Sequence, residues 1–163
     1  MYTVYDIANW FLANVESVTN KKLQKLVYYA YAWFLVFNNK IAEDIELRFF
    51  DAHFEAWVHG AACPELYDKY KEYGSSNIQK YVGELADFSA DELEVLNQVC
   101  DIYGKYNGNE LESICCQEDP WKNARKDLNN YELSTNKITD SDIFNYYIKK
   151  CSKYKMIKQQ IRS

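Results

Sequence analysis

The stretch from Thr19 to Asn39 constrains the fold most, because it predicts one long helix with almost no polar face. Thr19-Asn20 suits a helix start and Asn38-Asn39 suits a helix end. Between them, apolar and aromatic residues follow helical spacing and then widen around the helix: Leu23, Leu26, Val27, Tyr28, Tyr29, Ala30, Tyr31, Trp33, Phe34 and Phe37. A helix that is apolar nearly all round belongs at the centre of a domain. The sequence therefore predicts that the other elements pack around residues 20–38.

Shorter elements are predicted on both sides of this helix. Capping signals and periodicity indicate helices over 4–15 and 64–73, a short helix or turn at 78–81, and further helices beginning near Ser89, Gly108, Asp119 and Thr139. Residues 40–59 break the helical period and are typical of two short strands or extended segments. Two prolines and five glycines leave few breaks and no long linker. We therefore expect a mainly α (α+β) fold, a compact single domain over 1–163 with a small two-stranded β element near residues 45–59.

The charge of the chain is unevenly distributed. The net charge is −5, but residues 149–163 hold five lysines, one arginine and no acid, so that this segment carries +6 and residues 1–148 carry −11. An acidic body repels nucleic acid and attracts basic proteins. The basic segment is either a solvated helix end, where cations offset the helix dipole, or a nucleic-acid-binding arm.

Targeting signals and paired cysteines are not apparent in the sequence. The start Met1–Val4 has no basic or apolar leader region, and no apolar run approaches the ~20 residues needed to span a bilayer. The five cysteines form no CxxC pair. These features predict a cytoplasmic protein with reduced thiols and no membrane partner.

Catalytic chemistry has one candidate in the sequence, His59 with Cys63 beside a helix start that Pro64 predicts. A helix N-terminus lowers the pKa of a thiol, and a nearby histidine can take its proton, so a Cys-His hydrolase or transferase is one alternative. Gly60 and Pro64 place the two residues off one continuous helix, and no third orienting residue is identified. The two histidines and the adjacent Cys115-Cys116 do not have metal-ligand spacing. No nucleotide-binding or hydrolase motif is present. We expect no enzyme activity, no cofactor and no metal.

Five short motifs follow one another over nearly the whole chain. They are Tyr5–Leu12, Lys22–Tyr29 with Ala32-Trp33, Glu55–Gly60 with Pro64–Tyr67, Glu118–Trp121, and Ile138-Thr139 with Tyr146-Tyr147. Together they resemble the SocA-like antitoxins, also called the Panacea antitoxin domain family. The chain departs from the family pattern after Gly60, where it has Ala61-Ala62 instead of a Gly-Pro-Val-like segment, so the turn there is less constrained.

The resemblance implies a bacterial or phage-associated antitoxin of a toxin-antitoxin system. Such a protein has no catalysis of its own and neutralises a co-encoded toxin by direct protein–protein binding. A SocA-type member instead acts as an adaptor that delivers its toxin to a protease, and this alternative stays open. The expected partner is therefore a cognate toxin, with a protease in the adaptor alternative. No small-molecule substrate or nucleic acid is expected, and association of the chain with itself is left open.

The candidate partner-binding residues come from the motifs of this resemblance. Gln24, Lys25 and Tyr28, with Gly60, Pro64 and Tyr67, are expected to share a surface where the helix over 20–38 meets the turn before Pro64. Trp57, His59 and Trp121 complete the predicted set. Leu23 and Leu26 are expected in the core. The alternative is that the motif residues only hold the fold, since glycine, proline and tryptophan often meet backbone and packing needs.

Overall fold

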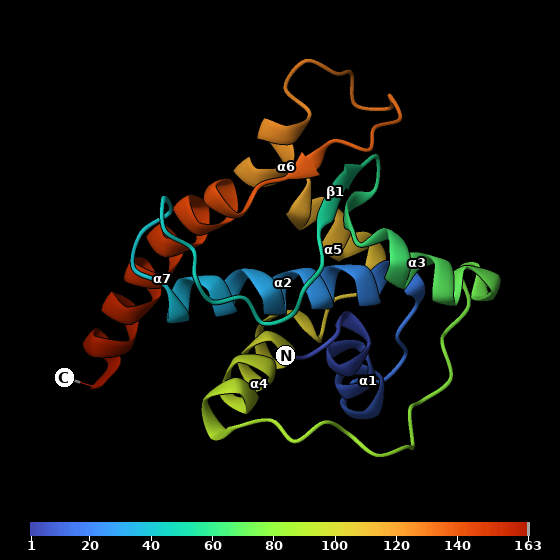
Figure 1. The fold of residues 1–163 in the computed structure, drawn as a ribbon, viewed down its shortest axis with the longest axis horizontal. Helices are drawn as coiled ribbons and strands as arrows, with labels where there is room; N and C mark the ends of the chain where they lie inside the picture. Colours follow the sequence, from blue (N-terminus) through green and yellow to red (C-terminus); the bar gives the residue numbers. More distant parts are fainter. Residues whose placement is uncertain (163) are drawn as a thin grey trace.

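The central element of the fold is α2 (Asn20–Asn38), which is capped by Thr19 and Asn39 as the sequence predicts. Fifteen of its nineteen residues are buried, including Leu23 and Leu26. It packs against α1, α3, α4, α5, α7 and β2, and Figure 1 shows it running through the middle of the molecule. This confirms the expectation that an all-round apolar helix organises the domain.

The computed structural model describes the backbone of residues 1–162 and the side chains of residues 1–151. The predicted basic tail at 149–163 lies outside the described side chains from Ser152 onward. The remaining helices are α1 (Val4–Asn14), α3 (Pro64–Tyr70) with the 3₁₀ turn η1 (Lys71–Tyr73), α4 (Ala90–Tyr103), α5 (Gly108–Cys115), α6 (Asp119–Ala124) and α7 (Asp140–Arg162). The fold is mainly α with a small β element, as expected.

The sheet has three short antiparallel strands in the order β2-β1-β3. β1 (Phe54–Trp57) pairs with β2 (Gly60–Ala62) through a tight hairpin, and with β3 (Lys137–Ile138) on its other edge. The predicted range of 45–59 therefore contains only one of the strands. The second strand comes after the turn, and the third is two residues long, which is too short for a period-2 pattern to appear.

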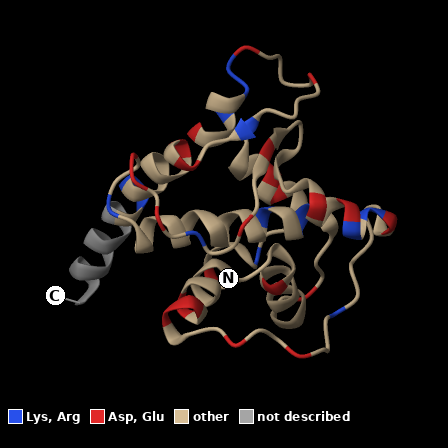
Figure 2. Ribbon diagram, in the orientation of Figure 1, with Lys and Arg blue, Asp and Glu red and all other residues tan. Residues whose placement is uncertain are grey.

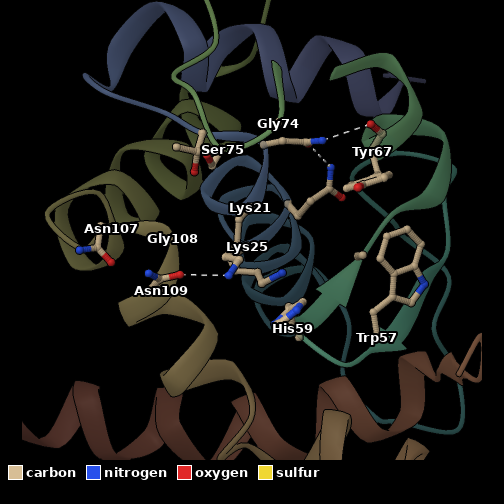
Figure 3. A pocket seen from close by; sticks show the side chains of 15 residues that line it. Lys21, Lys25, Trp57, His59, Tyr67, Gly74, Ser75, Asn107, Gly108 and Asn109 are labelled. Atoms are coloured by element: carbon tan, nitrogen blue, oxygen red, sulfur yellow. Dashed lines mark hydrogen bonds between the residues drawn. The ribbon is translucent and has the colours of Figure 1, made fainter. Parts of the chain in front are cut away.

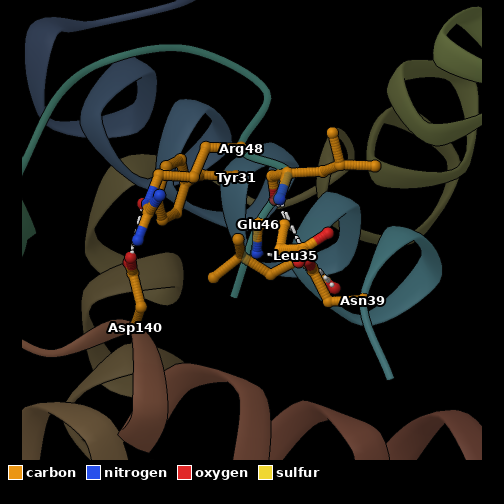
Figure 4. Close-up of polar contacts among 7 residues, drawn as sticks. Tyr31, Leu35, Asn39, Glu46, Arg48 and Asp140 are labelled. Atoms are coloured by element: carbon orange, nitrogen blue, oxygen red, sulfur yellow. Dashed lines mark hydrogen bonds and ion pairs between the residues drawn. The ribbon is translucent and has the colours of Figure 1, made fainter. Parts of the chain in front are cut away.

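The segment before β1 is a loop, although its apolar residues suggested a strand. Phe49 and Phe50 are buried, yet the backbone of this segment is held by the Asn39 side chain (Figure 4). Asn39 Oδ1 accepts hydrogen bonds from the N–H groups of Glu46 and Leu47, at 2.9 and 3.0 Å, and Nδ2 donates to the Leu47 carbonyl at 2.8 Å. A side-chain partner thus replaces the neighbouring strand that a β-segment requires.

The same loop is tied to the start of α7. Arg48 Nε lies 2.8 Å from Asp140 Oδ2, and the Tyr31 hydroxyl donates to Asp140 Oδ1 at 2.6 Å (Figure 4). Asp140 lies in the first turn of α7, where a carboxylate also interacts favourably with the helix dipole. One acidic side chain therefore joins α2, the loop and α7.

The prediction of a short helix or turn at 78–81 is wrong. This segment is extended and runs beside the end of α1: Ile78 N–H donates to the Val18 carbonyl at 2.7 Å, and Tyr81 N–H to the Leu12 carbonyl at 3.3 Å. The backbone groups that a helix would satisfy internally are therefore bonded to another part of the chain.

A buried carboxylate, Glu118, joins three helices. Its Oε1 accepts hydrogen bonds from the hydroxyls of Tyr29 on α2 and Tyr147 on α7, at 2.9 and 2.7 Å. Its Oε2 lies 3.1 Å from Lys150 Nζ. Burial raises the pKa of Glu118, and the three donors oppose that shift. Glu118 directly precedes α6, so this cluster fixes α6 and α7 against the central helix.

We expect Glu118→Ala to lower the free energy of unfolding by about 3 kcal/mol, because two buried hydroxyls lose their acceptor and Lys150 loses its counter-ion. Glu118→Gln should lower it by less, since the amide oxygen still accepts from the tyrosines. Urea denaturation followed by circular dichroism measures both values. The exposed Glu94→Ala is the matched control and should change stability by less than about 0.5 kcal/mol. Equal stability of Glu118→Ala and Glu94→Ala would contradict the role given to the cluster.

Candidate functional site

A pocket of about 540 Å³ opens where the start of α2 meets the β1–β2 hairpin, α3 and the start of α5 (Figure 3). Its size lies within the range of ligand and peptide sites in proteins. Two helix N-termini form part of its wall: α2 contributes residues 19–21, and α5 contributes residues 107–109. The 3₁₀ turn is followed by Gly74 and Ser75, which complete the lining.

The two helix starts can approach closely because α5 begins with glycine. A Cβ on Gly108 would lie 3.2 Å from both Lys21 Cβ and Thr19 Oγ1, which is tighter than ordinary packing. Each start is capped by its own side chain: Thr19 Oγ1 accepts from the N–H of Lys22, and Asn107 Oδ1 accepts from the N–H of Glu110. The positive ends of both helix dipoles therefore lie at the pocket.

A chain of amide hydrogen bonds forms the wall between α2 and α3. Gln24 Oε1 accepts from the Cys63 N–H at 2.9 Å, and Gln24 Nε2 donates to Asn20 Oδ1 at 3.0 Å. Asn20 Nδ2 then donates to the Tyr67 carbonyl at 3.2 Å. These contacts set the position of α3, and with it the Tyr67 ring at the rim.

Lys25 lies in the pocket wall with only 3% of its surface exposed. Its Nζ donates to the Ala61 carbonyl at 3.1 Å, and burial lowers its pKa. Gly60 makes room for this side chain, because a Cβ there would lie 2.8 Å from Lys25 Cε. Gly60 also has a φ of +105°, so the position needs glycine for its backbone as well.

The rim carries aromatic and charged side chains that are partly exposed. The rings of Trp57 and Tyr67 meet edge to face with centroids 5.0 Å apart, and Trp57 Nε1 donates to Glu55 Oε1. His59 Nδ1 and Lys21 Nζ lie 2.9 and 2.8 Å from the same oxygen, Glu112 Oε1. Lys21 Nζ also donates to Asn109 Oδ1 at 3.0 Å (Figure 3).

The structure brings six of the nine predicted residues to this pocket: Gln24, Lys25, Trp57, His59, Gly60 and Tyr67. Pro64 begins α3 beside it. Tyr28 lies in the core against Phe54 and is not part of the surface. Trp121 is also buried, and its Nε1 donates to the Trp57 carbonyl at 2.7 Å. Gln24 and Lys25 line the pocket and also hold the backbone around it, and a role of these residues in binding a partner stays a prediction.

Sequence reasoning missed the part of the pocket formed by helix starts. Thr19-Asn20 and Asn107-Gly108 are visible in the sequence as capping signals, and both helices begin there. The signal that the two starts meet is Gly108, whose missing side chain permits the contact, but a glycine beside a cap has several uses. Only the folded structure shows which of these uses applies to Gly108.

The alternative of a Cys63–His59 nucleophile is not supported by the geometry. Cys63 is buried, and burial raises the pKa of its thiol to about 11. Its Sγ lies 3.7 Å from Glu65 Oε1, whereas His59 contacts Glu112 on the rim. A neutral thiol beside a carboxylate is the opposite of an activated one.

Within the described residues, no three histidine, cysteine or carboxylate side chains are grouped closely enough to hold a metal ion. A helix with the length and apolarity needed to cross a bilayer is also absent from the part of the chain that the structure describes.

These features define a mainly α domain whose candidate site is a pocket with a buried lysine in its wall. Residues 23–122 match the family described as "Antitoxin SocA-like, Panacea domain". The match covers more than half of the chain, and the protein belongs to this family. Comparisons with curated proteins and with solved structures give no match.

Gly60→Ala should lower the free energy of unfolding by about 2 kcal/mol, because it adds backbone strain and a clash with Lys25 Cε. The control is Gly74→Ala: Gly74 also has positive φ, at +57°, but an added Cβ would meet no atom within 4 Å. Urea denaturation should show a smaller loss for the control. If both variants lose the same stability, the packing of Lys25 against Gly60 is not a constraint.

Alkylation of Cys63 should be slow at pH 8 and rise with pH through pH 10, because its raised pKa, about 11, leaves few thiolates at neutral pH. Mass spectrometry of iodoacetamide-treated, folded protein gives the rate at this residue. Cys100, which is less buried, is the internal reference. Rapid modification of Cys63 at pH 7, with a plateau below pH 9, would contradict the assignment and restore the catalytic alternative.

Proposed function

We propose that this protein is an antitoxin that neutralises a co-encoded toxin by binding it directly, without catalysis. The proposal rests on one observation: most residues that line the pocket lie within the part of the chain that matches the antitoxin family. The matched residues, 23–122, include every pocket residue from Gln24 to Asn109. The pocket is thus built largely from the part of the chain that defines an antitoxin-like domain.

The rim has the side chains that most often anchor protein interfaces. Tryptophan and tyrosine supply large contact areas with few rotatable bonds, and they are enriched among residues that dominate binding energies. Trp57 and Tyr67 lie together on the rim, where Tyr67 is 39% exposed. The amide-bonded wall beneath them holds α3 in place, so a partner meets a preorganised surface.

The charge of the body suits a basic partner. Residues 1–148 carry −11, and Figure 2 shows acidic residues on several elements, including α3, α4 and α6. Complementary charge increases the rate of encounter and suppresses wrong partners. A toxin that acts on RNA carries a basic surface and would be attracted in this way.

Co-expression tests this proposal. The reading frame beside the gene should stop growth when expressed alone, and the wild-type chain should restore growth and co-elute with its product. Tyr67→Ala should weaken binding about tenfold, or 1.4 kcal/mol, because it removes a rim anchor. Isothermal titration calorimetry of the purified pair measures the change.

Tyr131→Ala is the matched control, since Tyr131 is an exposed tyrosine that is not part of the pocket lining. It should leave affinity unchanged. A harmless neighbouring gene product, or one that never associates with the chain, contradicts the proposal. An immunoblot of the toxin separates the two modes of neutralisation: direct binding preserves its level, whereas a protease adaptor lowers it.

A further inference from the structure

Two buried lysines at the start of α2 have different electrostatic surroundings. Lys22 is 5% exposed, and its Nζ donates at 2.7 Å to the carbonyl of Gly104, the C-cap of α4. The C-terminal end of a helix carries partial negative charge, so Lys22 has a built-in compensation. Lys25 donates to the carbonyl of Ala61 on β2 and lies near Cys115, in the last turn of α5, but unlike Lys22 it lines the pocket.

No carboxylate in the described part of the chain forms an ion pair with Lys25. The acidic side chain that acts on it electrostatically is Glu112, and the oxygen Oε1 of Glu112 already lies within 3 Å of both Lys21 and His59. Cys115 is the other close neighbour, but burial raises the pKa of its thiol to about 12, so it stays neutral. The ammonium of Lys25 is thus left without a counter-ion of its own.

Helix N-termini add positive potential to the pocket that Lys25 lines. The pocket wall includes the N-termini of α2, with nineteen residues, and of α5, with eight. Both ends carry partial positive charge, and backbone N–H groups at helix starts favour anions. A buried ammonium is unfavourable unless an anion joins it, and burial accordingly lowers the pKa of Lys25. An anion in the pocket would stabilise the charged form of this side chain.

We propose that the pocket receives a carboxylate of the bound polypeptide partner, with the ammonium of Lys25 as its counter-ion. This inference rests on the proposed function. A single negative charge fits better than a phosphate dianion, because one ammonium is unpaired and Glu112 at the rim repels further negative charge. The aromatic rings of Trp57 and Tyr67 and the amides of Asn20 and Asn109 can hold the peptide that carries the carboxylate.

The first arm of the test needs no toxin. Sodium acetate, added to the full-length protein at constant ionic strength against sodium chloride, should give saturable ¹⁵N–¹H shifts at the amides of Gly60, Ala61 and Gly108. Lys25→Met should abolish these shifts. Lys22→Met is the matched control, because it removes an equally buried lysine outside the pocket lining, and it should keep them. Acetate shifts that are absent, or that persist in Lys25→Met, overturn the proposal.

The second arm uses the toxin identified by co-expression. Lys25→Met should weaken toxin binding about 30-fold or more, and Lys22→Met should not. Asn109→Asp supplies a second variant that does not disturb the core: it places a competing carboxylate at an exposed position of the lining, and should weaken binding about tenfold with unchanged unfolding. One Asp→Asn or Glu→Gln variant of the toxin should show no further loss when combined with Lys25→Met.

The two arms of the test distinguish failure of this inference from failure of the proposed function. A toxin that binds the wild type and both pocket variants equally overturns this inference and leaves the proposed function standing. In that case, acetate binding would assign the pocket to a free carboxylic acid instead of the partner. If no toxin associates with the chain, the proposed function fails, and the inference fails with it even where acetate binds.

Discussion

The burial of α2 on nearly every side is the constraint on which the rest of the structure depends. A surface helix can place polar residues on its solvent face, but α2 has almost no such face, so its polar side chains must find partners inside the protein. Lys22 reaches the end of α4, Gln24 reaches the start of α3, and Lys25 reaches β2. The polar residues near the start of the helix thereby position the elements that surround the pocket.

The burial of α2 also explains where its tyrosines lie and which groups their hydroxyls contact. A chain with fifteen tyrosines suggests a recognition surface, yet the tyrosines of α2 lie in the core, where each buried hydroxyl needs an acceptor. Tyr29 and Tyr31 obtain theirs from Glu118 and Asp140, two carboxylates at the N-terminal ends of α6 and α7. These two tyrosines of α2 therefore join helices through a ring and a hydroxyl at once.

The sequence predicted what depends on local patterns. Helix starts at Thr19, Ser89 and Asn107-Gly108 follow from capping chemistry, and the central place of α2 follows from its composition. Segments bonded to other parts of the chain were harder to predict. Of the two alternatives for Ile45–Phe50, a strand or an extended segment, the structure has no strand there, because Asn39 bonds its backbone, and the helix or turn predicted at 78–81 is wrong, because α1 and the residues that follow it bond this segment. Of the candidate site, the turn at Gly60, the helix start at Pro64 and the nearby Gln24-Lys25 pair were predicted. The second strand of the hairpin was not, and the contact between two helix starts is a tertiary fact with no periodic signal.

Three lysines in the first turns of α2 oppose the dipole of their own helix, and this arrangement needs a reason beyond helix stability. Tertiary contacts compensate two of them, since Lys21 lies beside Glu112 and Lys22 beside the C-cap of α4. The third, Lys25, donates to a neutral carbonyl, within a body whose net charge is −11. The basic partner that we propose would be attracted to that body over a broad area, which brings two proteins together without fixing their orientation. In the proposed complex, the contact between Lys25 and one carboxylate of the partner would add what the broad attraction lacks, a defined orientation of the two proteins.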